Sequence, residues 1–302
     1  MSRVIVTGVG GFIGHHVVKK LKDTGYEVIG ITKISSKNEP DVDNVHKIGL
    51  SSQEQLNGII KENDIVIHLA WSTVPASSES DSEKDVITNI PASLNLIEAC
   101  ARKKASHFIF LSSGGTVYGN AEYLPIDEIH PTRPISPYGI DKLMVEKYLH
   151  MFSHRFGLPY TILRPSNVYG PNYRLDKGQG VIGYWLESIK KNEPLAIIKG
   201  GDIVRDYLHI DDLTELLAKL VAQPPDNQIF NVGTSIGTSL LELLEIIQNI
   251  KTNEIRLTEV PKRKFDVNTN ILSFDKLKKQ LNWQPKVDLV EGIEDLFSKS
   301  SN

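Results

Sequence analysis

The sequence predicts an α/β fold in which a doubly wound parallel sheet is followed by a smaller C-terminal lobe. Two observations lead to this prediction. Short apolar runs of strand length alternate with longer segments of helical periodicity as far as residue 165, and the first apolar run leads directly into a glycine-rich turn. Alternation at this spacing implies right-handed strand–helix–strand crossovers, which place helices on both faces of a parallel sheet.

The first part of the chain contributes the expected sheet and its helices. Strands are expected at residues 3–7, 27–32, 64–70, 107–112 and 160–164, and helices at 12–24, 52–62, 85–104 and 137–156. The near-continuous apolar run at 108–111 is typical of a central strand that is covered on both faces.

The pattern changes after residue 165, where Pro165 and Pro171 interrupt the alternation. Further helices are expected at 181–192 and from Asp211, and short strands near 195–198 and 230–233. Ser239 followed by Glu242 is a capping-box pattern for one more helix. We therefore expect two domains, 1–165 and 166–302, with some elements of the second returning to the sheet.

Composition limits the class of protein. The 302 residues carry a net charge of −3 and 40% hydrophobic residues, ordinary values for a soluble globular enzyme. Neither nucleic-acid binding nor a membrane span is predicted from the charge and the short apolar runs. Cys100 is the only cysteine and is expected as a small buried hydrophobe. Because no signal peptide precedes the strand at Val4, we expect a cytoplasmic location. The nine histidines lack ligand spacing, so no metal site is predicted.

The glycine-rich turn after the first strand has the composition of a phosphate-binding loop, with Thr7-Gly8 opening the pattern T-G-x-x-G-x-x-G. Glycine permits left-handed backbone angles and close approach of a ligand, and the helix that follows directs its first N–H groups toward an anion. We therefore predict that a dinucleotide rests its pyrophosphate here. The residues expected to contact it are Gly8, Gly10, Gly11, Phe12, Ile13 and Gly14.

Tyr138 and Lys142 lie four residues apart at the start of an expected helix, so their side chains share one helix face. A free tyrosine has a pKa of about 10 and is a poor base at neutral pH. A neighbouring ammonium favours the phenolate, so the pair can accept the proton of a sugar or alcohol hydroxyl. The same spacing recurs at Tyr173 and Lys177 in a loop containing Pro, Gly and Asp, where we interpret it as accidental.

Two serines, Ser112 and Ser113, follow an expected central strand. In an open parallel sheet, ligands bind beyond the carboxyl ends of the strands. Either hydroxyl could hold a substrate oxygen and pass its proton to Tyr138. The alternative is a turn in which the serine side chains bond local backbone.

Together these motifs resemble the extended short-chain dehydrogenase/reductase family of nucleotide-sugar epimerases and dehydratases, and the resemblance covers nearly the whole chain. The segment Ser136-Pro137-Tyr138-Gly139-x-x-Lys142 looks especially like UDP-galactose 4-epimerases. The other motifs are Thr7-Gly8-x-x-Gly11-x-x-Gly14, His68-Leu69-Ala70, Val117-Tyr118-Gly119, Arg164-Pro165-x-Asn167-Val168-Tyr169-Gly170-Pro171 and Arg205-Asp206-Tyr207-x-His209-x-Asp211-Asp212.

The resemblance implies a Rossmann-like fold with a nicotinamide cofactor. Tyr138 would be the base, and Lys142 its electrostatic partner and an anchor for the nicotinamide ribose. Leu69 and Ala70 would also contact the cofactor. Relatives that use NAD usually carry an acidic residue after the second strand, where it holds the adenosine ribose hydroxyls. This chain has Thr32-Lys33 there, which favours a 2′-phosphate, so the cofactor is NAD or NADP.

The resemblance also implies a nucleotide-diphospho-sugar substrate bound by the C-terminal lobe, and a homodimer formed through helices 85–104 and 137–156. Asn167, Arg205 and Arg263 would contact the diphosphate, for which arginine is suited because its planar fork donates two parallel hydrogen bonds. Asn270 stands at the family's substrate-gate position and is smaller than the tyrosine of some relatives, so an N-acetylated sugar is allowed.

The position of the family's catalytic Ser or Thr, four residues before Tyr118, is Gly114 here. The hydroxyl is therefore assigned to Ser113 or Ser112, with the choice left open. A 4,6-dehydratase fits less well, because Gly115 and Thr116 replace the acidic pair that such enzymes usually carry.

Three activities are weighed. The first is a 4-epimerase that acts on a UDP-hexose through a transient 4-keto sugar. The second is an NADPH-dependent reductase of an NDP-4-keto-6-deoxyhexose, which Thr32-Lys33 favours. The third is a non-catalytic nucleotide-binding protein, against which the intact Tyr138–Lys142 pair argues.

Overall fold

The structure is a computed structural model that describes residues 3–33, 42–171, 180–198, 203–250, 255–263 and 266–299. The chain forms two compact units, each assembled from separate segments. Unit 1 comprises Met1–Ser113, Ser136–Arg164 and Thr214–Phe230, and unit 2 comprises Gly114–Ile135, Pro165–Leu213 and Asn231–Asn302. Tyr173 and Lys177 lie outside the described residues.

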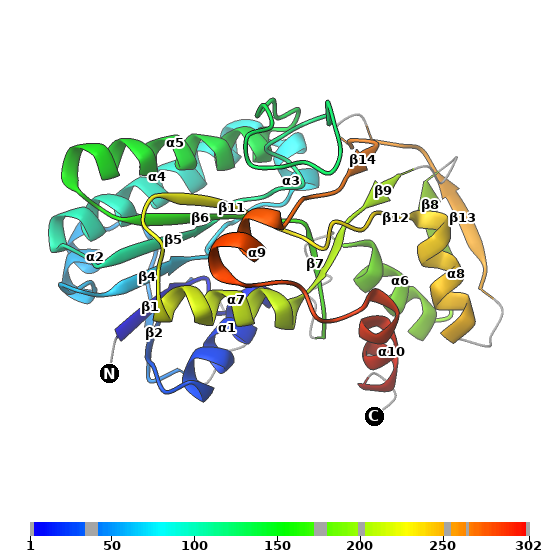
Figure 1. Cartoon of the computed structure of the whole chain (residues 1–302), viewed down its shortest axis with the longest axis horizontal. Helices are drawn as coiled ribbons and strands as arrows, with labels where there is room; N and C mark the ends of the chain where they lie inside the picture. Colours follow the sequence, from blue (N-terminus) through cyan, green and yellow to red (C-terminus); the bar gives the residue numbers. More distant parts are fainter. Residues whose placement is uncertain are drawn as a thin grey trace. The chain divides into compact units, whose positions relative to one another are not determined.

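A seven-stranded sheet forms the centre of unit 1, with the strand order β11-β6-β5-β4-β1-β2-β3 (Figure 1). Its strands are β1 (Arg3–Thr7), β2 (Glu27–Thr32), β3 (Asn44–Lys47), β4 (Ile65–His68), β5 (His107–Leu111), β6 (Tyr160–Pro165) and β11 (Gln228–Val232). All paired strands from β3 to β6 run parallel. The chain builds outward from β1 to β3 and then continues from β4 in the opposite direction. This change of direction creates a switch point beside β1, beyond which ligands bind in such sheets.

Helices cover both faces of this sheet. They are α1 (Phe12–Asp23), α2 (Gln53–Ile59), α3 (Pro75–Ser80), α4 (Ser82–Lys103), α5 (Pro137–Phe156) and α7 (Ile210–Ala222). Figure 1 shows α4 and α5 on one face, with α1 on the other. A core of buried aliphatic and aromatic side chains from strands and helices, among them Ile5, Phe108, Leu96 and Leu149, joins the sheet to its helices. The predicted doubly wound α/β fold is confirmed.

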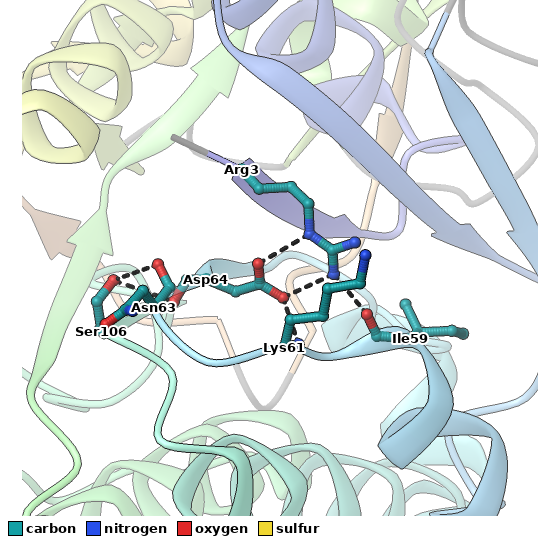
Figure 2. A network of polar contacts seen from close by, with 6 residues as sticks. All are labelled: Arg3, Ile59, Lys61, Asn63, Asp64 and Ser106. Carbon is teal, nitrogen blue, oxygen red and sulfur yellow. Dashed lines mark hydrogen bonds and ion pairs between the residues drawn. The ribbon is translucent and has the colours of Figure 1, made fainter. Parts of the chain in front are cut away.

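The amino ends of the central strands are joined by a polar network around Asp64 (Figure 2). Arg3 donates from Nε and Nη2 to the two carboxylate oxygens of Asp64 at 2.9 and 2.8 Å. The same guanidinium donates to the Ile59 carbonyl, and the Lys61 amide donates to Asp64 at 2.7 Å. Next to it, Ser106 donates from Oγ to the Asp64 carbonyl at 3.1 Å. The network therefore links β1 to the segments that precede β4 and β5.

Unit 2 is built from short strands and helices. Its elements include β7 (Asn167–Tyr169), α6 (Val181–Lys190), β8 (Leu195–Ile198), β9 (Val204–Arg205), β10 (Tyr207–His209), β12 (Thr238–Ser239), α8 (Leu240–Ile250), β13 (Leu257–Val260), β14 (Thr269–Asn270), α9 (Asp275–Leu281) and α10 (Leu289–Lys299). The pairs β10–β7 and β13–β8 and the trio β12-β9-β14 form small sheets. Ile182, Trp185, Leu243 and Ile293 belong to its separate hydrophobic core.

Most expected elements occur within a few residues of their predicted bounds. The expected strand at 64–70 ends earlier, at His68, because the Thr7 hydroxyl accepts hydrogen bonds from the Leu69 and Ala70 amides. The predicted capping box is present: Ser239 Oγ accepts from the Glu242 amide at 3.2 Å, and Glu242 accepts from the Ser239 amide at 2.7 Å. Several elements were not predicted, among them β3 and α3 in unit 1 and β7, β10, β13, α9 and α10 in unit 2. Cys100 is buried.

Candidate active site

The carboxyl ends of four neighbouring strands bring most of the predicted cofactor residues to one edge of the sheet in unit 1. Thr7, the last residue of β1, is in register with Ile31 of β2 and His68 of β4. His68 is in turn in register with Phe110 of β5. The glycine loop, Thr32-Lys33, Leu69-Ala70 and Ser112-Ser113 follow these strand ends directly.

The glycine loop is a tight turn that excludes side chains at two positions. Gly8 has φ +76°, a left-handed conformation, and a Cβ there would lie 2.8 Å from the Ala70 nitrogen. A Cβ on Gly14 would lie 2.2 Å from the Gly8 carbonyl oxygen. Gly11 is the N-cap of α1, and it offers no side chain to satisfy the first helical N–H groups. This backbone cradle at a helix N-terminus fits the pyrophosphate of a dinucleotide.

A buried hydrogen-bond chain fixes the loop against the next strand. His68 Nδ1 lies 2.8 Å from Thr7 Oγ1, and its Nε2 lies 3.0 Å from Ser93 Oγ. Because the Ser93 hydroxyl donates to the Asn89 carbonyl at 2.8 Å, its oxygen is free to accept the Nε2 proton. His68 in its neutral form therefore satisfies both of its hydrogen-bond partners, Thr7 and Ser93. Burial, helped by the positive charge of Lys142, lowers the pKa of His68 to about 3.

Tyr138 is placed by the N-terminus of α5. Ser136 is the N-cap and accepts a hydrogen bond from the Gly139 amide at 3.2 Å, and Pro137 occupies the first helical position. The Tyr138 amide donates to Ser78 Oγ at 3.2 Å. The backbone that carries the phenol is therefore anchored from two sides.

Lys142 lies one turn further along α5 and is only 4% exposed. Its Nζ donates to the Leu111 carbonyl at 2.8 Å and lies 5.6 Å from the centroid of the Tyr138 ring. Burial lowers the pKa of Lys142 to about 7, while the charges of Asp85 and Glu146 oppose that shift. The ammonium is thus held beside the phenol, where its charge favours the phenolate.

The two candidate serines have different environments. Ser112 is 3% exposed, and its hydroxyl donates to Glu146 Oε1. Arg164 donates to both oxygens of the same carboxylate, from Nε at 3.0 Å and from Nη2 at 2.6 Å. Ser112 is therefore part of a buried structural network, whereas Ser113 is half-buried one residue further along the chain.

Thr32 and Lys33 occupy the end of β2, beside the strand that leads into the glycine loop. Thr32 is 8% exposed and Lys33 is exposed. Neither residue provides a carboxylate that could accept hydrogen bonds from both hydroxyls of a ribose.

In unit 2, Asn167 of β7 is bonded to Asp206, the residue that follows Arg205 of β9. Asn167 donates from Nδ2 to the Asp206 carbonyl at 3.2 Å. Arg205 precedes that residue on β9 and donates from Nη1 to the Val204 and Asn268 carbonyls at 2.9 and 3.2 Å. Burial lowers the pKa of Arg205, an effect opposed by the negative charge of Asp266. A half-buried cation of this kind is suited to an anionic ligand.

Arg263 and Asn270 have different roles in unit 2. Arg263 forms a bidentate pair with Asp266 at 2.8 and 3.0 Å, and its side chain is 52% exposed. Asn270 is fully buried on β14, in register with Arg205. Its amide donates to the Gly114 carbonyl at 3.0 Å, so in this structure the side chain supports the backbone at Gly114.

Trp71 is a site residue that sequence reasoning missed. Its indole lies over Lys142, with 3.8 Å from Nζ to the ring centroid, and it meets the Tyr138 ring edge-on with the centroids 6.0 Å apart. The available signal was its position directly after the His68-Leu69-Ala70 motif. No group of three or more metal-ligating side chains is found among the described residues, and no described helix is long and apolar enough to cross a membrane.

Comparison with known proteins shows the family to which the chain belongs. The model of the NAD dependent epimerase/dehydratase family matches residues 4–233. The chain is 30% identical to a UDP-glucose 4-epimerase of Mycolicibacterium smegmatis, over 96% of both chains. It is also 30% identical to a dTDP-4-dehydro-6-deoxyglucose reductase of Escherichia coli, over 97% of this chain and 96% of that one. The protein belongs to the NAD-dependent epimerase/dehydratase family, which confirms the resemblance found in its motifs.

Solved structures are similar over the same length. The UDP-glucose 4-epimerase of Thermotoga maritima, solved with UDP-glucose, superposes with a TM-score of 0.92 at 35% identity and covers 99% of this chain and 100% of its own. The Thermus thermophilus UDP-glucose 4-epimerase, solved with NAD, gives a TM-score of 0.90 at 30% identity, with 98% and 99% covered.

Proposed function

We propose that this protein is an NAD-dependent 4-epimerase of a UDP-hexose that acts through a transient 4-keto sugar. The observation that carries the proposal is the Tyr138–Lys142 pair, in which a buried ammonium lies 5.6 Å from the phenol ring at the carboxyl edge of the sheet. Similarity to UDP-glucose 4-epimerases over nearly the whole chain supports the substrate class.

The residues of unit 1 supply the acid–base chemistry in this proposal. Tyr138 accepts the proton of the C4 hydroxyl and later returns it, so the residue ends each cycle as it began. Lys142 stabilises the phenolate while that proton is absent. Ser113 provides the hydroxyl next to the substrate oxygen, because the Ser112 hydroxyl is already committed to Glu146. Bound NAD supplies the hydride acceptor and donor at C4. Gly8, Gly10, Gly11, Phe12, Ile13, Gly14, Leu69 and Ala70 would hold it.

The residues of unit 2 are proposed to bind the substrate. Asn167, Arg205 and Arg263 would contact the diphosphate, with Arg263 exchanging its bidentate contact with Asp266 for one with phosphate. Because Asn270 is smaller than tyrosine, an N-acetylated UDP-hexose stays within the proposed substrate range.

A second candidate is an NADPH-dependent reductase of an NDP-4-keto-6-deoxyhexose. Thr32-Lys33 favours a cofactor with a 2′-phosphate, and the Escherichia coli reductase is a relative of similar identity. The two activities differ in their use of the cofactor. An epimerase regenerates it in every cycle, whereas a reductase consumes NADPH in proportion to product.

We further propose a cytoplasmic homodimer that forms through α4 and α5. These helices carry the exposed apolar side chains Val86, Ile87 and Ile140, which are 38%, 63% and 48% exposed. Burial of such side chains against a second copy would remove apolar surface from water. Light scattering coupled to size-exclusion chromatography should give twice the chain mass. A monomer at micromolar concentration would contradict this part of the proposal.

The deciding experiment supplies UDP-glucose, UDP-N-acetylglucosamine or dTDP-4-keto-6-deoxyglucose, each with and without NADPH, and identifies the products. The proposal expects conversion of a UDP-hexose without net cofactor consumption. Tyr138→Phe should abolish turnover and retain NAD binding, while Tyr148→Phe on the same helix should leave both unchanged. NADPH-dependent product from the 4-keto sugar alone would favour the reductase. Absence of any turnover would favour a non-catalytic nucleotide-binding protein.

A further inference from the structure

The ammonium of Lys142 is surrounded by aromatic rings. Its Nζ lies 3.8 Å from the Trp71 centroid, 4.9 Å from that of Phe110 and 5.6 Å from that of Tyr138. A cation within about 6 Å of a ring face is attracted by the negative face of the ring, most strongly by tryptophan, and more so when water is excluded. The Trp71 contact is the shortest of the three, and it brings in a residue with no role in the proposed proton transfer.

The position of the Trp71 ring is fixed by the segment that follows it. The Ser72 amide and hydroxyl both donate to Asn89 Oδ1 on α4, at 2.9 and 2.8 Å. The Thr73 hydroxyl donates to Asp85 Oδ1, one helical turn earlier on the same helix. Because both acceptors are buried, the segment is anchored to α4 at two successive residues. The indole cannot leave Lys142 without breaking these bonds or changing its own rotamer.

The charge of Lys142 depends on a balance among its neighbours. Asp85 on α4 and Glu146 on α5 favour the ammonium, and burial disfavours it. His68 of β4, which faces it from the sheet, is neutral, and Tyr138 faces it from α5. The pKa of Lys142 lies at about 7 as a result. A modest loss of stabilisation would therefore remove the charge within the physiological pH range.

We propose that Trp71 is a positioning residue whose indole face keeps Lys142 protonated and directed toward Tyr138. This inference rests on the proposed function, because a charged Lys142 serves to make Tyr138 a base. Trp71 itself transfers no proton. Loss of the indole face should lower the pH at which Lys142 loses its proton by about one unit, a tenfold change in its ionisation equilibrium.

Nuclear magnetic resonance of lysine side chains tests this directly in the full chain, without any substrate. Lys142→Met identifies the Lys142 signal, and its titration is compared in wild type, Trp71→Phe and Trp71→Leu. We expect the midpoint to fall by about one pH unit in Trp71→Leu, with Trp71→Phe between it and wild type. Phe152→Leu, which removes a ring that packs on the same core, should leave the midpoint unchanged. An unchanged midpoint in Trp71→Leu would overturn the inference.

Two further measurements keep the outcome clear. If Trp71→Leu does not fold, uniformly fluorinated tryptophan retains the ring shape and weakens its negative face. The midpoint should then fall, and an unchanged midpoint would overturn the inference. In turnover assays, the alkaline limb of the kcat profile should move to lower pH in Trp71→Leu and return toward wild type in Trp71→Phe. If no nucleotide sugar is turned over, the proposed function fails, while the lysine titration still decides the role of Trp71.

Discussion

Glu146→Gln tests the buried ion pair that supports the end of β5. Glu146 is 2% exposed and Arg164 is 3% exposed, with contacts of 2.6 and 3.0 Å between them. The amide keeps the shape of the carboxylate and removes its charge, so the guanidinium stays buried without the negative charge of Glu146. Removal of one partner from a buried pair costs about 3–5 kcal/mol. For a chain of this size, that corresponds to a fall of roughly 5–8 °C in Tm.

The measurement is thermal and urea unfolding of wild type and variants in parallel. Glu98→Gln is the matched control, because Glu98 pairs with Arg102 on the exposed side of α4 at 2.7 Å. Such exposed pairs contribute about 0.3–0.5 kcal/mol. The double variant Glu146→Leu/Arg164→Met removes both charges and should recover most of the loss. If the free energy of unfolding of Glu146→Gln lies within about 1 kcal/mol of the wild-type value, the ion pair does not stabilise this strand end.

Three other predictions concern the glycine loop, His68 and the network in Figure 2. Gly14→Ala places a Cβ 2.2 Å from the Gly8 oxygen, so titration calorimetry should show at least a tenfold loss of NAD affinity. Gly58→Ala is the control, because a Cβ at that position meets nothing within 4 Å. Equal NAD affinity in the two variants would refute the assignment of the glycine loop as the pyrophosphate cradle. Because the pKa of His68 is lowered to about 3, the unfolded chain takes up its proton first as the pH falls below 6.5. Stability should drop by up to about 1.4 kcal/mol per pH unit between 6.5 and 3, a slope that should be shallower in His68→Gln. Asp64→Asn removes the carboxylate that pairs with Arg3, whose side chain is 16% exposed. Urea unfolding should show a free energy of unfolding lower by about 1–3 kcal/mol. A difference near zero would show that the pair does not stabilise the fold.

The sheet could be predicted from sequence because its signals are local. Apolar runs, helical periodicity and a glycine-rich turn each lie within a few consecutive residues, and they predict strands and helices that the structure contains. The strand β3 escaped prediction because it is short and at the sheet edge, with no fully buried residue. The helix α3 is only six residues long, with four serines or prolines among Pro75–Ser80 and no apolar stripe.

The fine structure of the site could not be predicted, because it depends on contacts between residues distant in sequence. Ser112 and Ser113 are alike as sequence, and only the carboxylate of Glu146, 34 positions away, distinguishes them. Trp71 is a lone aromatic residue with no periodic partner, and its relation to Lys142 becomes visible only when β4 and α5 are packed. The Tyr138–Lys142 pair could be predicted because one helical turn brings both side chains to the same face.

The hydroxyl of Thr7 has a consequence for how this site can change. It accepts from the amides of Leu69 and Ala70 at 3.2 and 3.1 Å, and the next residue is Trp71. One side chain thus joins the start of the dinucleotide loop to the segment that carries the ring beside Lys142, so a substitution of Thr7 reaches both at once.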